Sequence, residues 1–95
     1  MAPFDSIASS IIKEQQLIIG PLAWSEAKKV SGLSIVSQAS GEVHVEGGDQ
    51  KAVIDKLVAQ YERLFGKASH EVCKEAAASL IKGMPSGEVP ASLLA

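Results

Sequence analysis

Ninety-five residues suffice for one small domain, since globular domains commonly contain about 100–150 residues. Hydrophobic residues form 46% of the chain and charged residues 21%, a composition too apolar for an intrinsically disordered protein. The formal net charge of −2 argues against nucleic-acid binding, which normally needs a surplus of positive charge, and a single cysteine excludes an internal disulfide and a cysteine-based zinc site.

Two helices are predicted in the first third of the chain. Apolar residues follow helical spacing over 7–19, with Asp5 or Ser6 as the residue that caps the helix. A glycine–proline pair then interrupts the pattern, because proline removes an amide donor and clashes with the carbonyl four residues earlier. Proline also suits the first turn of a new helix, so a second, shorter helix is expected over 21–30, followed by Gly32 in a left-handed conformation.

The hydrophobic period changes in the middle of the chain. Apolar and polar residues alternate along 33–37 and again along 42–46, and the turn between them ends in glycine. This pattern predicts a β-hairpin, which the glycine pair 47–48 ends. An isolated hairpin is marginally stable and exposes two strand edges. We therefore expect it to pack on the long helix that follows and to pair with the hairpin of a second copy.

Two further helices are predicted after the hairpin. Asp49 caps the most clearly amphipathic segment of the chain, residues 49–65, and a glycine ends it. Ser69 begins another helix, whose apolar face continues almost to residue 82. The last segment, 86–95, is expected to be a loosely ordered tail with one short apolar turn.

This order of elements predicts a single mainly helical α+β domain over residues 1–95, with an all-helical bundle as the alternative. The longest apolar run, residues 17–24, is far shorter than the about 20 residues that span a membrane. No basic segment precedes the first apolar residues, as it would in an export signal. We expect no membrane partner, no nucleic-acid partner and a cytoplasmic location.

Two groups of side chains could carry chemistry. Glu42, His44 and Glu46 share one face of the second predicted strand and could bind a metal or act as acid and base, but a solvent-facing strand produces the same alternation. His70 and Cys73 are three residues apart on a predicted helix and could form a nucleophilic pair, but the cysteine falls within the apolar stripe. We therefore predict no catalytic residue, no metal ion and no cofactor.

The chain contains more apolar residues than a domain of this size normally buries in its own core. Its mean hydropathy is +0.17, and large exposed apolar patches usually mark contact sites. We expect a non-catalytic protein-interaction or regulatory module that acts as a homo-oligomer, most simply a dimer, with another protein as the alternative partner. The contact surface is predicted to combine the hairpin with the long helix through Ile35, Val43, Val45, Tyr61, Leu64 and Phe65.

Ligand binding is the alternative function. Alanines at positions 23, 27, 76, 77 and 78 fall on predicted helices and could leave a gap for an apolar ligand, as in a sensory domain. The same small side chains also allow helices to approach closely, which would leave no gap. A small metal-dependent or Cys/His-dependent enzyme is the third and weakest hypothesis.

Overall fold

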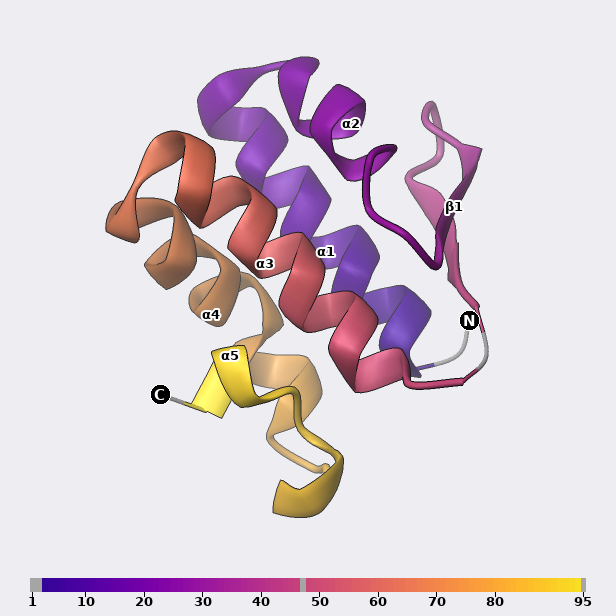
Figure 1. Cartoon of the computed structure of the whole chain (residues 1–95), viewed down its shortest axis with the longest axis vertical. Coiled ribbons are helices and arrows are strands. Elements are labelled where there is room, and N and C mark those ends of the chain that lie inside the picture. Colours follow the sequence, from indigo (N-terminus) through magenta and orange to yellow (C-terminus); the bar gives the residue numbers. More distant parts are fainter. Residues whose placement is uncertain (1–2, 47, 95) are drawn as a thin grey trace.

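The computed structural model describes residues 3–46 and 48–94, so Gly47 of the predicted glycine pair lies outside the described residues. The elements in chain order are α1 (Pro3–Ile19), α2 (Leu22–Ala27), β1 (Leu33–Ser37), β2 (Glu42–Val45), α3 (Gln50–Phe65), α4 (Lys67–Ile81), the 3-10 helix η1 (Ser86–Glu88) and α5 (Ala91–Leu94). The predicted mainly helical α+β fold with one antiparallel hairpin is confirmed (Figure 1). In the described part of the chain, no helix is both long enough and apolar enough to cross a membrane.

Helix α1 forms the centre of the core. It contacts α2, α3, α4 and β2, and so lies between the hairpin and the other long helices (Figure 1). Its buried face repeats at helical spacing and consists mainly of Ile7, Ala8, Ile11, Ile12 and Gln15. Burial of one large aliphatic side chain contributes about 1.5–3 kcal/mol, so the isoleucines of this face together stabilise the fold by several kcal/mol.

The start of α1 differs from the prediction. The helix begins at Pro3, whose missing amide has no cost in a first turn, and it includes both Asp5 and Ser6, so neither residue is its cap. Oδ1 of Asp5 instead accepts a hydrogen bond from the amide of Val45 in β2, at 2.7 Å. The side chain that local rules assign to capping therefore joins the helix to the hairpin.

Helix α2 is shorter than the predicted segment 21–30. The amide of Lys28 still bonds to a carbonyl four residues earlier, but the amides of Lys29 and Val30 bond to carbonyls three residues earlier, so the chain continues in tighter turns. Gly32 then takes a φ of +88°, the left-handed conformation that the sequence predicted. A Cβ at this glycine would lie 2.7 Å from Cγ2 of Val53, so the missing side chain also permits close contact with α3.

The hairpin packs chiefly on α1. Its register pairs Leu33 with Val45, Ser34 with His44, Ile35 with Val43, and Ser37 with Glu42, with an irregularity between Ile35 and Ser37. Val43 and Val45 of β2 are buried in the core. The expectation that the hairpin packs on the long helix is wrong, because the apolar face of α3 is already covered by α4, α1 and α5.

The C-terminal third is more ordered than the sequence suggested. Gly66, with a φ of +89°, is a one-residue link, so α4 begins at Lys67 rather than at the predicted Ser69. The segment predicted as a loose tail forms η1 and α5, and α5 packs on α3 and α4. Val89 and Leu93 are buried there, which ties the end of the described chain to the core.

Candidate interaction surface

The six residues predicted as an interface do not form one surface. Three are interior side chains, at most 2% exposed: Val43, Val45 and Tyr61. Ile35 and Phe65 are half-buried and pack on the core, and Leu64 is exposed. The hairpin lies at the right of Figure 1, whereas α3 ends at the left. The two predicted halves of the interface are therefore separate parts of the molecule.

Tyr61 has a structural position inside the chain. Its ring is fully buried, and its hydroxyl donates a hydrogen bond to the carbonyl of Ala23 in α2, at 2.7 Å. Burial raises the pKa of this hydroxyl above its ordinary value, because the charged form would be poorly solvated. The side chain therefore joins α3 to α2.

The outer edge of β2 lies against α1, and at Val45 it is bound by side chains of the same chain. In this register the amide and carbonyl of Val45 point away from β1. The amide donates to Asp5 Oδ1, and the carbonyl accepts a hydrogen bond from Gln50 Nε2 at 3.1 Å. Just before the strand, the carbonyl of Gly41 accepts a hydrogen bond from the hydroxyl of Ser9 at 2.6 Å. A strand of another molecule would have to displace these groups to pair here.

The outer edge of β1 is open. Ile35 stands opposite Val43 in the same relation as Leu33 opposite Val45, so its amide and carbonyl also point away from the hairpin. Among the described residues, no hydrogen-bond partner is present for these two groups of Ile35. The next residue, Val36, lies at the irregular position of the strand and is 58% exposed. This edge therefore combines free backbone groups with an exposed apolar side chain.

Comparison with models of known protein families, with curated proteins and with solved structures finds no match to this chain.

Three polar residues lie on the solvent side of β2 and of the position that follows it. Glu42, His44 and Glu46 are all exposed. His44 Nδ1 lies 3.5 Å from Asp5 Oδ2, and Glu46 accepts a weak hydrogen bond from the hydroxyl of Ser34 at 3.4 Å. Among residues 3–46 and 48–94, no three His, Cys, Asp or Glu side chains are grouped so as to hold a metal ion.

His70 and Cys73 do not act on each other. The cysteine is fully buried and its Sγ lies 3.4 Å from Nε2 of Gln15. Burial raises the pKa of the thiol to about 11, and the hydrogen bond from the glutamine opposes this shift in part. The two ring nitrogens of His70 instead face Glu62 Oε1, at 3.1 Å, and the carbonyl of Ser92, at 2.6 Å.

Cys73 is expected to resist alkylation in the folded protein. With a pKa near 11 rather than the ordinary 9, it holds about one-hundredth of the usual thiolate at neutral pH, and the reagent has no access to it. Mass spectrometry after iodoacetamide treatment at neutral pH should show unmodified native protein and complete modification in denaturant. Rapid modification of the native protein would contradict the place of Cys73 in the core.

The structure also reveals a polar cluster that the sequence did not indicate. The amide and hydroxyl of Ser92 in α5 both donate to Oδ1 of Asp55 in α3, at 3.0 and 2.6 Å, beside the contacts of His70. The serine has a single hydroxyl proton, and it is directed to Asp55 instead of His70. The hydrogen bonds of this cluster therefore hold α5 against α3, and they do not pair the serine hydroxyl with a base as in a catalytic triad. Local patterns cannot show a contact between residues 37 apart.

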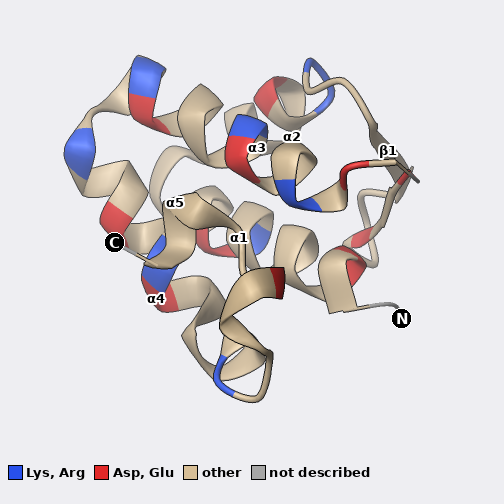
Figure 2. Cartoon of the chain, turned by 60° about the horizontal axis from the view of Figure 1, so that its bottom comes forward, with Lys and Arg blue, Asp and Glu red and all other residues tan. Residues whose placement is uncertain are grey.

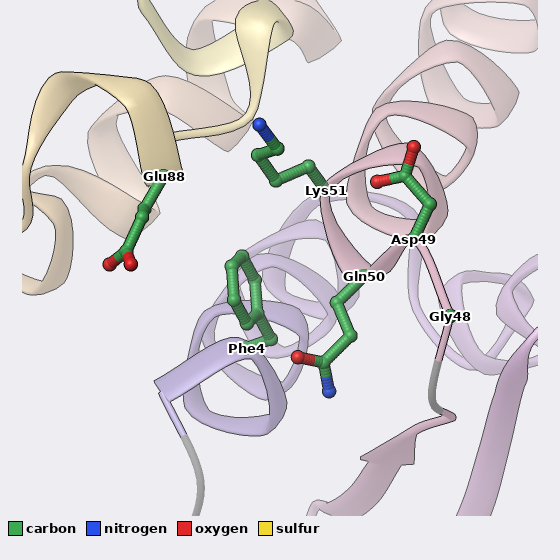
Figure 3. A pocket seen from close by; sticks show the side chains of 6 residues that line it. All are labelled: Phe4, Gly48, Asp49, Gln50, Lys51 and Glu88. Atoms are coloured by element: carbon green, nitrogen blue, oxygen red, sulfur yellow. The ribbon is translucent and has the colours of Figure 1, made fainter.

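A shallow hollow of about 260 Å³ lies where α1 and α3 begin and η1 passes (Figure 3). Three of its polar side chains, Asp49, Gln50 and Lys51, are already engaged within the chain. Asp49 accepts a hydrogen bond from the amide of Ala52, which confirms its predicted role as the cap of α3, and Lys51 donates to the carbonyl of Gly87 at 2.8 Å. Figure 3 shows Asp49 turned away from Phe4. These contacts make the hollow a junction between elements.

The alanines weighed as the lining of an apolar pocket serve helix packing. Ala23, Ala27 and Ala77 are fully buried in the core, and Ala76 packs against it. Ala78 is exposed on α4. None of the three hollows described for this structure is lined by these alanines.

Proposed function

We propose that this chain is a non-catalytic protein-interaction module that acts as a homodimer through the open edge of β1. The observation that supports this function is the contrast between the two edges of the hairpin. The edge of β2 lies against α1 and is bound at Val45 by Asp5 and Gln50, whereas β1 offers free backbone groups at Ile35. We place the module in the cytoplasm, where a single unpaired thiol such as Cys73 is normal.

Antiparallel pairing of two β1 strands about a twofold axis would give hydrogen-bond partners to the free amide and carbonyl of Ile35. Each strand would donate and accept main-chain hydrogen bonds with its copy, and the two hairpins would form one four-stranded sheet. Val36 lies close to the middle of the strand and would be near the axis. Because β1 has five residues, the interface is small, and we expect a dissociation constant of about 1–100 µM.

Replacement of Val36 by lysine tests this dimer. Val36→Lys places two positive charges near each other across the axis, while the exposed position keeps the fold intact. We expect sedimentation equilibrium to show dimers of the wild type at about 100 µM and a dissociation constant raised at least about tenfold in the variant.

Leu17→Lys is the matched control. Leu17 is 80% exposed on α1, so the same change there removes an exposed apolar side chain without touching β1. This variant should dimerise like the wild type. A monomeric wild type at these concentrations, or dissociation caused by Leu17→Lys but not by Val36→Lys, would overturn the proposed function.

A further inference from the structure

A groove between α3 and the segment that joins α2 to β1 gathers basic side chains. Its volume is about 470 Å³, which is within the range of small-molecule sites. We call it the basic groove, and it is lined by Lys29, Val30, Ser31, Lys56, Ala59, Gln60 and Arg63. In Figure 2 the basic positions after α2 and along α3 are blue.

The acidic and basic residues of α3 lie on different sides of the helix. Asp55 accepts hydrogen bonds from α5, and Glu62 pairs with the histidine of α4, so both acidic residues are engaged away from the groove. Lys56 and Arg63, each one residue later, line the groove. Among the described residues, neither of these two cations forms a salt bridge. Their positive charge is therefore available to a ligand.

The carboxylate beside the groove is neutralised and helps to arrange it. Glu26 accepts hydrogen bonds from Lys29 Nζ at 3.0 Å and from Gln60 Nε2 at 2.7 Å. The hydrogen bond from Lys29 is the main reason why the pKa of Glu26 is lowered, and Gln60 and Arg63 add to the effect. Oε1 of Gln60 also accepts a hydrogen bond from Arg63 at 2.6 Å, which orients the guanidinium. The groove is thus lined by three cations and has one carboxylate beside it, so it keeps a positive balance.

The spacing of the cations indicates the shape of the ligand. Lys56 and Arg63 are seven residues apart, so their backbone positions are separated by about 10 Å along the helix axis. A chain of phosphates carries charge along such a length, whereas one phosphate concentrates it at a point. We propose that the basic groove binds an elongated polyphosphate, free or as the triphosphate of a nucleotide, through Lys29, Lys56 and Arg63.

Titration calorimetry with sodium tripolyphosphate tests this site. We expect the wild type to bind, and Lys56→Gln and Arg63→Gln each to weaken binding about tenfold, because each removes one charged hydrogen-bond donor. Lys82→Gln, an equal change of charge at the exposed end of α4, should weaken it by no more than about twofold. Absence of binding, or equal losses in all three variants, would overturn the proposal.

A second arm uses ATP to identify the source of the phosphates. If the affinity for ATP equals that for tripolyphosphate, the groove recognises phosphates alone. If the affinity for ATP is higher, the nucleoside is also bound. Both results support the site.

Amide shifts in NMR spectra on addition of tripolyphosphate should centre on residues 29–31 and 56–63. Shifts centred elsewhere would contradict the proposed site. Val36→Lys should bind tripolyphosphate like the wild type, because Val36 does not line the groove, so this site and the dimer can fail independently.

Discussion

Tyr61→Ala is expected to lower the free energy of unfolding by about 3–5 kcal/mol, because it leaves a cavity where a fully buried ring had been. A domain of this size has roughly 5–14 kcal/mol of stability in total, so the variant is expected to be close to unfolding. Urea denaturation followed by circular dichroism measures this loss.

Tyr61→Phe separates the ring from its hydroxyl. The ring stays in the core, and the hydrogen bond to the carbonyl of Ala23 is lost, so we expect a loss of about 1 kcal/mol. A Tyr61→Ala variant that keeps its stability and loses self-association would show the opposite: that Tyr61 is a contact residue of the dimer, as the sequence suggested.

Asp5→Ala is expected to lower the free energy of unfolding by about 2–3 kcal/mol. The substitution removes the carboxylate that accepts from the amide of Val45 and leaves this buried amide without its partner. Urea denaturation gives the size of the loss, and hydrogen exchange at Val45 should become faster than in the wild type.

Glu14→Ala is the control for this change, because Glu14 is an exposed carboxylate on the same helix. It should alter stability by less than about 0.5 kcal/mol. Equal stability of the Asp5 and Glu14 variants would mean that the contact between α1 and β2 does not depend on Asp5.

The order of elements was predictable because it follows from local periodicity. The stripe along α3 and the alternation in the hairpin are visible within single segments, and the structure confirms both. The start of α1 was not predictable, since Asp5 has the local appearance of a cap but bonds to Val45, 40 residues away. Local rules describe a residue's neighbours in sequence, whereas the fold also uses neighbours in space.

The candidate surfaces were harder to predict for the same reason. The alternation along β2 and the apolar stripe along α3 indicate that Val43 and Tyr61 are buried. Neither pattern can distinguish burial in the chain's own core from burial against a second copy. The basic groove was missed because Lys29, Lys56 and Arg63 come from distant segments of a chain whose net charge is negative. Their convergence exists only after α3 has packed beside α2.

The unequal edges of the hairpin limit how far association can proceed. A sheet grows into a filament only if both strand edges of every subunit can pair, and here the edge of β2 lies against α1 and is bound at Val45 by Asp5 and Gln50. In the proposed dimer each subunit would have one edge available for strand addition, so the sheet would stop growing at four strands.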